Sequence, residues 1–549
     1  MKKLFIENKE AIKFSAQLVK ILLENRGIKT KKETDSFLKP SLSDVTISTV
    51  KINTYQLKKA LARIKKATEK KEKIIVYGDY DVDGICASAI LWETLNSLGA
   101  DVLPFIPSRF EEGYGLSEAG ILNLKSQNPN LKLIITVDNG IVANDAVDIA
   151  NKNGIDVIIT DHHVPSKKLP DALAIVHTTL LCGTGVAYLL SQELKIEQEN
   201  HLALVALATI ADLVPLTKAN RILVYFGLLS LRKTKRIGLN ALIDKAGIKK
   251  EEIGVYEIGH ILAPRFNAMG RLASAMDSLR LICTNDKKRA EDLSSLLTKT
   301  NFERQQVTMS AVTHAKNKVE EKQIKNLIFI ADESYQQGIV GLVAGRLVEE
   351  YYFPSIVISK GEKFSKASAR SIKGFNIIEF LRTASDLLVD VGGHPMAAGF
   401  TVETDKIELL EKKLYESAGK LLDKKHLQRS LRVDAILPQN FINQEVYSQI
   451  QKLAPFGMAN PEPTFLTKKL QIQDIRFVGK ESKHLKFNFL FENSNFQVQG
   501  IAFGIGDKNE FKIGDGVDVV FTMSLNEWNG NKKLELRIKD LDHHGKDLS

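Results

Sequence analysis

The stretch Ile74-Ile75-Val76-Tyr77-Gly78-Asp79-Tyr80-Asp81-Val82-Asp83-Gly84 determines the fold that we expect for this chain. Its apolar start predicts a short buried β-strand over 74–77, and the strand runs into a turn rich in carboxylates. Asp79, Asp81 and Asp83 are spaced two residues apart, so in an extended chain they share one face and can converge on a cation. The stretch therefore predicts a strand with a metal site at its carboxyl end.

Strands and helices alternate after this stretch. We expect helices over 85–98 and 144–153, and strands over 131–137 and 156–160. Such alternation predicts a parallel α/β sheet.

The two later strands also end in polar residues. Asp138 follows one of them, and His162 and His163 follow the other. Open α/β sheets bind their ligands at the carboxyl ends of the strands. We therefore expect these three side chains beside the first carboxylates. Asp212 adds a carboxylate at the end of an apolar helix. Taken alone, an Asp at this position is expected to cap the helix or to face solvent.

A calcium-binding EF-hand is the alternative for the carboxylate turn. Such a loop follows a helix and needs a bidentate Glu at its twelfth position, whereas here a strand precedes and the twelfth residue is Ile90. Oxygen and imidazole ligands without thiolate suit Mn²⁺ or Mg²⁺ better than structural zinc. Two such ions would account for the number of carboxylates. Because a pair of ions can activate water and stabilise displacement at phosphorus, the ligand set predicts hydrolysis of phosphodiester bonds.

The length of 549 residues suggests several domains, at roughly 100 to 200 residues each. Six short strands after residue 430 predict a small β-barrel. We expect an α/β multidomain chain with four parts: a helical and loop segment over 1–60, a parallel-sheet catalytic domain with a connecting helix over 61–235, a second α/β domain over 236–423, and an OB-like β-barrel over 424–549.

The formal net charge of +10 favours a phosphate-rich partner, although a Lys-rich proteome would give the same balance. Cys86, Cys182 and Cys283 form no CxxC pair, so neither disulfides nor a thiolate zinc site are indicated, and a reducing cytoplasm fits. The start of the chain has no apolar signal segment, and the apolar run over 202–211 is too short to span a bilayer.

The segments DYDVDG, VDNG and DHH, in this order, resemble the DHH phosphoesterase superfamily. Four later segments resemble the RecJ exonucleases in particular: LAPRFNAMGR over 262–271, SARS over 368–371, GGH over 392–394 and APFGMANP over 454–461. The resemblance covers residues from about 40 to 545. It implies a second domain like DHHA1, and digestion of single-stranded DNA from the 5′ end with release of 5′-mononucleotides.

The resemblance also implies roles for the site residues. Asp79 and Asp81 would serve one ion, while Asp83, His162 and Asp212 would serve the other. Asp138 would bridge the two ions. His163 would contact the scissile phosphate or assist proton transfer.

Substrate contacts are implied as well. Ser368, Arg370 and Ser371 resemble a pocket for a 5′-phosphate, and His394, next to Gly392 and Gly393, would lend positive charge to the transition state. Arg109 and Tyr114 offer a cation and an aromatic ring that could hold the strand, and Arg271, Arg304 and Lys483-His484 are weaker candidates.

The resemblance implies a monomer that acts in DNA repair and recombination, with single-stranded DNA, a single-strand-binding protein and a helicase as partners and no membrane. Two other functions remain open: a DHH/DHHA1 phosphodiesterase of short RNA or cyclic dinucleotides, and a catalytically inactive replication scaffold. The barrel disfavours the first, and the intact set of carboxylates and histidines disfavours the second.

The chain departs from the family pattern at three places. Tyr77 stands where many DHH proteins carry a metal-facing His, Tyr335-Gln336 stands where Trp-His is frequent, and the loop after Val176 is short. A second DHH triplet, Asp542-His543-His544, follows the last expected strand, and we interpret it as a solvated chain end.

Overall fold

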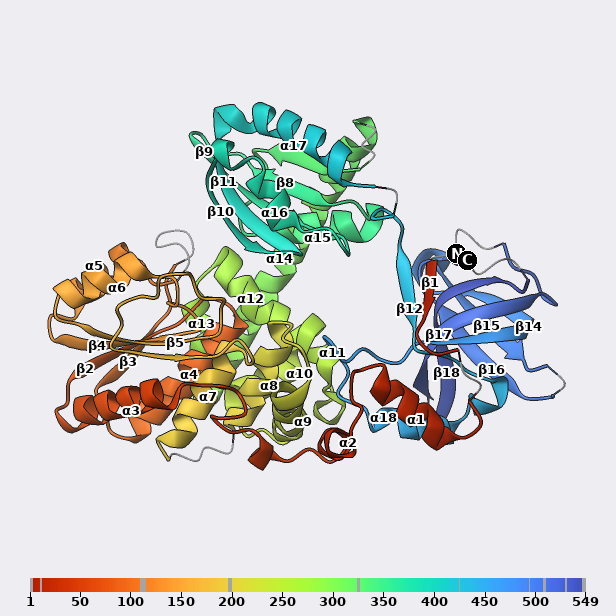
Figure 1. Cartoon of the computed structure of the whole chain (residues 1–549), viewed down its shortest axis with the longest axis horizontal. Helices are drawn as coiled ribbons and strands as arrows, with labels where there is room; N and C mark the ends of the chain where they lie inside the picture. Colours follow the sequence, from red (N-terminus) through yellow and green to blue (C-terminus); the bar gives the residue numbers. More distant parts are fainter. Residues whose placement is uncertain are drawn as a thin grey trace. The chain divides into compact units, whose positions relative to one another are not determined.

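The computed structural model of the chain describes residues 3–9, 12–108, 115–195, 200–322, 326–423, 425–492, 494–506, 510–528 and 531–545 (Figure 1). The chain divides into two compact units. The first unit comprises Asp35–Gln306 and Pro455–Pro461, and the second comprises Met1–Thr34, Val307–Ala454 and Glu462–Ser549. The domain boundaries that we expected near residues 60, 236 and 424 stay predictions.

A five-stranded parallel sheet forms the centre of the first unit. Its strand order is β3-β2-β4-β5-β6, and every pairing is parallel. The strands are β2 (Lys73–Tyr77), β3 (Val102–Phe105), β4 (Leu131–Val137), β5 (Asp156–Asp161) and β6 (Ala174–His177). This confirms the parallel sheet predicted from the alternation of apolar strands and helices.

Helices cover both faces of this sheet, as the two sides of β2 show. Ile74 and Val76 belong to one buried core, whereas Ile75 and Tyr77 belong to another. The chain supplies the surrounding helices before, between and after the strands: α3 (Thr54–Glu69), α4 (Val82–Ser97), α5 (Glu118–Gln127), α6 (Asn144–Lys152), α7 (Gly183–Glu193) and α8 (His201–Ala211). A sheet buried on both sides explains why its strands are almost wholly apolar.

The rest of the first unit is helical. No strand occurs among the described residues between β6 and residue 328, although we expected strands from about residue 250 onward. The helices are α9 (Lys218–Arg232), α10 (Ile237–Lys245), η2 (Lys250–Glu252), α11 (Val255–Glu257), the π-helix η3 (Ile258–Leu262), α12 (Ala263–Leu272) and α13 (Ala275–Cys283). The long helix α14 (Lys287–Glu321) starts in this unit and ends in the second. Among the described helices, none combines the length and apolar character needed to cross a bilayer.

The second unit contains a mixed five-stranded sheet of order β10-β11-β9-β8-β7. Only β7 and β8 run parallel, and the remaining neighbours are antiparallel. The strands are β7 (Ile328–Asp332), β8 (Ser355–Ser359), β9 (Phe364–Arg370), β10 (Leu388–His394) and β11 (Ala397–Glu403). The accompanying helices are α15 (Val340–Tyr351), α16 (Ile377–Arg382), η4 (Ser385–Leu387), η5 (Thr404–Lys406) and α17 (Ile407–Leu421).

A closed β-barrel follows in the same unit. Its sheet order is β14-β15-β16-β18-β17, and a further pairing between β14 and β17 closes the ring. The strands are β14 (Phe465–Val478), β15 (His484–Leu490), β16 (Gln497–Ala502), β17 (Gly516–Trp528) and β18 (Asn531–His543), with β13 (Ala435–Ile436) beside β14 and with η6 (Gln439–Phe441), α18 (Gln444–Gln451) and η7 (Lys480–Ser482) nearby in the chain. Five strands closed in this order form an OB-like barrel, as predicted.

The amino-terminal segment adds to the second unit. Its strand β1 (Lys3–Ile6) pairs in parallel with β12 (Ser430–Val433), just before the barrel. Asp434 accepts hydrogen bonds from the Asn25 side chain and from the Thr464 backbone. The segment continues through α1 (Ser15–Glu24) and α2 (Lys31–Leu38), with η1 (Leu42–Asp44) following in the first unit.

Candidate metal centre and phosphate cluster

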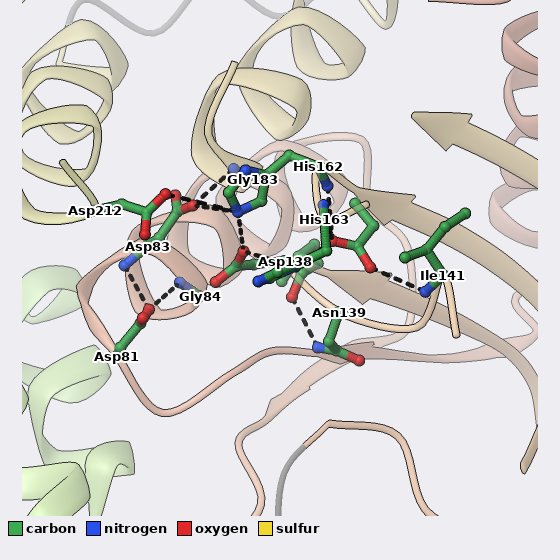
Figure 2. A network of polar contacts seen from close by, with 12 residues as sticks. Asp81, Asp83, Gly84, Asp138, Asn139, Ile141, His162, His163, Gly183 and Asp212 are labelled. Carbon is green, nitrogen blue, oxygen red and sulfur yellow. Dashed lines mark hydrogen bonds and ion pairs between the residues drawn. The ribbon is translucent and has the colours of Figure 1, made fainter. Parts of the chain in front are cut away.

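The candidate metal centre lies at the carboxyl ends of three adjacent strands of the parallel sheet. Asp79 follows β2, Asp138 follows β4, and His162 follows β5. Figure 2 shows the side chains of Asp83, Asp138, His162 and Asp212 pointing toward one another. The expected gathering of polar residues at this edge is therefore present in the structure.

The carboxylate turn itself differs from our expectation. We expected an extended chain, but α4 begins at Val82, so Asp83 lies in the first helical turn. The reason is that Asp81 acts as the helix N-cap: its Oδ1 accepts hydrogen bonds from Asp83 N at 2.9 Å and Gly84 N at 3.1 Å (Figure 2). A turn of helix, rather than the pleat of a strand, thus sets the directions of these carboxylates.

Asp83 is held by the start of another helix. The backbone N–H groups of Gly183 and Thr184, at the N-terminus of α7, each donate to its carboxylate at 2.7 Å. The Thr184 hydroxyl also donates to the backbone oxygen of Asp83 at 2.8 Å. Backbone donors at a helix N-terminus stabilise a negative charge, so the start of α7 is a suitable partner for the Asp83 carboxylate and fixes its orientation.

Asp138 is the most constrained carboxylate of the site. It is buried, and its φ of 62° places it in the left-handed region that few side chains adopt. Its Oδ1 lies 3.0 Å from His162 Nε2, yet it accepts no hydrogen bond within the described part of the chain. Burial and the nearby charges of Asp83 and Asp81 raise its pKa well above the usual range. A buried, unsatisfied carboxylate oxygen of this kind fits a bound cation.

The two histidines have different surroundings. His162 Nε2 lies 3.6 Å from an oxygen of Asp83 and 3.7 Å from one of Asp212, while burial lowers its pKa. His163 Nδ1 lies 2.8 Å from Asp161 Oδ1. Burial alone would lower the pKa of His163, but the hydrogen bond and charge of Asp161 outweigh it and raise that pKa to about 9. His162 is therefore suited to bind a metal as a neutral ligand, and His163 to carry a positive charge.

Three groups of side chains have ligand atoms within 4.8 Å of one another. They are Asp79, Asp81 and Asp138; Asp83, His162 and Asp212; and Asp138, His162 and His163. Burial and the surrounding carboxylates raise the pKa of Asp212 to about 8. So many carboxylates at such distances repel one another unless cations lie between them, so the residues fit divalent ions.

Tyr77 does not face this centre. Its ring is buried in the core of the sheet, and its hydroxyl donates to the backbone oxygen of Gly115 at 3.1 Å. The position that is a metal-facing His in many DHH proteins is thus a core residue here. Asp79 is the side chain that contributes to a ligand group from this turn.

The second candidate cluster lies on β9 in the second unit. Arg370 Nη1 donates to Ser368 Oγ at 2.9 Å, and a Cβ added at Gly341 near the start of α15 would lie 2.8 Å from Arg370 Nη2. Ser371 does not join them: it is buried, and its hydroxyl donates to the backbone oxygen of Phe375 at 2.6 Å. The three-residue donor cluster that we expected is therefore a pair beside a helix N-terminus.

His394 and the two glycines lie on β10 of the same sheet. His394 pairs with Ala397 of β11, which pairs in turn with Arg370. Gly393 has a φ of 140°, and a Cβ there would lie 2.4 Å from the backbone oxygen of Ala397, so only glycine fits. Directly opposite residues share a face of a sheet, so His394 and Arg370 project to the same side.

The remaining candidates are scattered. Arg109 and Tyr114 lie outside the described residues. Arg271 is half-buried on α12, and the guanidinium of Arg304 donates to Asn301 Oδ1 on its own helix. His484 begins β15 and follows Lys483.

The structure shows where the remaining unusual segments of the sequence lie. Tyr335 is buried with its hydroxyl 3.0 Å from His314 Nδ1, and Gln336 is exposed. The short loop after Val176 runs from the end of β6 to the start of α7. The second DHH triplet is not a solvated tail: Asp542-His543 end β18, and His544 Nδ1 lies 2.7 Å from Asp518 Oδ1.

Several supporting residues were not among the predicted site residues. Asp161 Oδ1 accepts from the backbone N–H groups of both histidines, and Asn267 Oδ1 accepts from Val82 N at 3.0 Å. A Cβ at Gly270 would lie 2.5 Å from the backbone oxygen of Tyr80. Asp161 stands in the DHH segment itself, whereas the motif over 262–271 gave no sign that its Asn and Gly contact the carboxylate turn.

Comparisons with known proteins agree with this architecture. Three family models match the chain: "DHH family, N-terminal domain" over residues 73–214, "DHHA1 domain" over 308–420 and "RecJ OB domain" over 433–540. The first two, together with the carboxylate and histidine centre, define the class as a DHH-family protein with a DHHA1 domain. The RecJ OB domain over the barrel distinguishes the chain within this class.

The single-stranded-DNA-specific exonuclease RecJ of Bacillus subtilis is 38% identical over 537 residues, which cover 95% of this chain and 67% of that protein. RecJ of Escherichia coli K12 is 30% identical, with 95% of each chain covered. A crystal structure of RecJ from Thermus thermophilus in complex with Mn²⁺ superposes with a TM-score of 0.83 at 28% identity, over 99% of this chain and 80% of that one. The chain belongs to the RecJ family.

Proposed function

We propose that this chain is a metal-dependent exonuclease that hydrolyses single-stranded DNA from the 5′ end and releases 5′-mononucleotides. The observation that carries the proposal is the buried Asp138, whose Oδ1 accepts no hydrogen bond from the described residues while carboxylates and imidazoles surround it. The relatives named single-stranded-DNA-specific exonucleases supply the substrate class.

Two divalent ions, Mn²⁺ or Mg²⁺, fit the ligand set. Asp79 and Asp81 would hold one ion, Asp83, His162 and Asp212 would hold the other, and Asp138 would bridge them. Two of the three groups of ligand atoms support this division, namely Asp79, Asp81 and Asp138, and Asp83, His162 and Asp212. The absence of thiolate from these groups favours Mn²⁺ or Mg²⁺ over zinc. Such ions, when bound, activate water and neutralise charge at phosphorus.

His163 would act on the substrate rather than on an ion. Its Nδ1 is engaged by Asp161, which places Nε2 on the opposite side of the ring. With a pKa near 9, the imidazole carries a proton at neutral pH, and Nε2–H can donate to a phosphate oxygen. Asp161 would keep the ring oriented and charged.

The cluster on β9 would bind the 5′-phosphate. Ser368 and Arg370 offer hydroxyl and guanidinium donors, and the N-terminus of α15 adjoins them at Gly341. His394 projects to the same face of the sheet as Arg370 and adds a further donor. An enzyme that holds a terminal phosphate at this cluster starts digestion at an end of the strand.

The barrel would supply affinity for long single strands. Arg476, Lys486 and Arg537 lie in one row across β14, β15, β16 and β18, with Ile501 between the last two. Their cations can follow a phosphate backbone without reading its sequence. Action as a monomer in DNA repair and recombination, beside a single-strand-binding protein and a helicase, stays a prediction from the family.

Substitution of the central carboxylate tests this function. Asp138→Asn keeps a residue that tolerates the left-handed backbone and removes only the charge. We expect loss of essentially all nuclease activity on 5′-phosphorylated single strands with Mn²⁺. The thermal midpoint of the metal-free protein should be unchanged or slightly higher, because burial and the neighbouring carboxylates disfavour a charge on Asp138. Retention of more than about a tenth of the rate, a barrier change below about 1.4 kcal/mol, would remove Asp138 from the centre of the reaction.

A further inference from the structure

Three neighbouring rows of residues on one face of the second sheet form a trough. In the central row Ser368, Gly399 and Gly392 lie opposite one another on β9, β11 and β10. Gly392 and Gly399 are exposed, a Cβ added at Gly392 would meet nothing within 4 Å, and one at Gly399 would meet its nearest atom at 3.7 Å. The central row is therefore an open floor without side chains at Gly399 and Gly392, whereas Gly341 of α15 adjoins its Ser368 end.

Arg370 and His394 form one wall of this trough. They lie in the row on one side of the floor, two positions along their strands from Ser368 and Gly392. Alternate residues of a strand project to the same face, so both side chains stand beside the floor. This is the wall that the proposed function already uses for the 5′-phosphate.

The opposite wall contains a cation, Lys366. Lys366 lies two positions before Ser368 on β9 and pairs with Thr401, which pairs with Asp390 on β10. Lys366 Nζ donates to Thr401 Oγ1 at 2.6 Å and lies 3.7 Å from Asp390 Oδ2. Both charged side chains are more than half exposed, at 52% and 61%, so this ion pair is weak and leaves the Lys366 charge accessible.

The width of the trough suits one phosphate group. Residues two apart on a strand are about 6.6 to 6.8 Å apart, so Lys366 and Arg370 are separated by roughly 13 Å along β9. Charge-assisted hydrogen bonds span about 2.7 to 2.9 Å, which leaves room for a phosphate over the floor with a long cationic side chain on each side. Arg370, Ser368 and His394 approach such a dianion from one side, so a cation on the opposite side would complete its contacts.

We propose that Lys366 is a further substrate-binding residue, which contacts the terminal phosphate from the wall opposite Arg370 and His394, and that Asp390 restrains it when no phosphate is bound. The inference rests on the proposed function, because it requires that the trough hold the 5′-phosphate. Asp390 then has two effects on an incoming anion: it competes for the Lys366 ammonium, and it repels the phosphate directly.

The test measures kcat/KM of the full-length protein on the same single strand with a 5′-phosphate and with a 5′-hydroxyl. Lys366→Ala should reduce the advantage of the phosphorylated strand about tenfold, the size of one partly solvated charge-assisted hydrogen bond. Lys366→Arg should restore most of it. Asp390→Asn should increase the advantage about two- to threefold, since it removes one exposed opposing charge. Lys363→Ala, an exposed lysine in the segment before β9, is the matched control and should change nothing.

A second measurement keeps the test independent of turnover. A 5′-mononucleotide should inhibit the Lys366→Ala variant less strongly, and the Asp390→Asn variant more strongly, than the unsubstituted protein. Stronger inhibition of Lys366→Ala together with weaker inhibition of Asp390→Asn would overturn the inference. The Arg370→Ala variant separates the two proposals. If Arg370→Ala abolishes the advantage of the phosphorylated strand while Lys366→Ala leaves that advantage within twofold, Lys366 has no role and the 5′-phosphate pocket stands. If neither variant changes the advantage, the trough does not bind the 5′-phosphate, and the inference about Lys366 fails as well.

Discussion

Gly183 shows how closely the metal centre is packed at the scale of single residues. A Cβ there would lie 2.6 Å from Asp138 Cβ and 2.8 Å from Asp138 Cα, and these atoms cannot swing away as the end of a flexible side chain can. We expect Gly183→Ala to push α7 from Asp138 and to weaken the hydrogen bonds to Asp83. Mn²⁺ affinity measured by calorimetry should fall, and kcat should decrease by at least about a hundredfold, because misplacement by about 1 Å has that effect.

Gly185→Ala on the same helix is the matched control. Its Cβ would lie 3.1 Å from Leu181 Cβ, compared with 2.6 Å from Asp138 Cβ for Gly183, so a shift of a few tenths of an ångström relieves the contact. We expect Mn²⁺ affinity and kcat within a fewfold of the unsubstituted protein. Equal losses in both variants would show that α7 tolerates no side chain at all, and that the contact with Asp138 is not the cause.

The sequence could point to Asp79, Asp138 and His162 as candidate metal ligands because each follows a strand of a recognisable parallel sheet. It could not predict Gly183 and Asn267 as supporting residues, since their partners Asp83 and Val82 lie 100 and 185 residues away. Ser371 differed from expectation because a hydroxyl in a turn readily bonds to nearby backbone oxygen, here that of Phe375. Candidate ligands that lie together in a short motif were therefore predictable from the sequence. Residues that hold those ligands in place from distant segments were not.

At the scale of elements, α4 is fixed to α8 and α10 by a buried ion pair. The carboxylate of Glu93 on α4 accepts hydrogen bonds from Arg236 Nη1 and Nη2, each at 2.7 Å. His201 Nε2 lies 3.1 Å from Glu93 Oε2. Burial alone would raise the pKa of Glu93, but the hydrogen bonds from Arg236 and His201 outweigh it and lower the pKa to about 2. Because the folded-state pKa lies below the unfolded value of 4.5, this pair stabilises the fold above pH 4.5.

That stabilisation should be lost as the pH falls from about 4.5 to about 2. We expect Glu93→Gln to lower the free energy of unfolding by roughly 3 kcal/mol at pH 7 and by much less at pH 3, since it leaves Arg236 buried without its charge partner. Urea unfolding followed by circular dichroism at both pH values measures the difference. A loss of the same size at pH 3 and pH 7 would show that the ion pair does not titrate in this range.

The barrel offers a prediction about affinity. Lys486→Ala with Arg537→Ala removes two cations from one row across its outer face. Binding of a long single strand should weaken, and the slope of log K against log salt should fall by about 1.4, at roughly 0.7 per phosphate contact on a single strand. Lys20→Ala with Lys413→Ala changes the net charge equally and should leave the slope unchanged. Equal slopes for the two double variants would argue that this row does not touch the strand.

At the scale of the whole molecule, the parallel sheet, the second sheet and the closed barrel were predictable from apolar periodicity and from the spacing of short strands. The place of the amino-terminal segment was not, because its strand β1 pairs with β12, more than 400 residues later. A four-residue strand with half-exposed side chains has too few apolar residues to be recognised from its sequence. Its extended conformation depends on pairing with the partner strand.

The pattern of cleavage on defined substrates tests the central claim most directly. The substrates are a linear single strand labelled at its 5′ or 3′ end, the same sequence as a blunt duplex, and a circular single strand, each incubated with the full-length protein and Mn²⁺. We expect the 5′ label to be released at once as a mononucleotide, the 3′-labelled strand to shorten progressively from its 5′ end, and the duplex and the circle to remain intact. Cuts within the circle, or shortening from the 3′ end, would contradict the account.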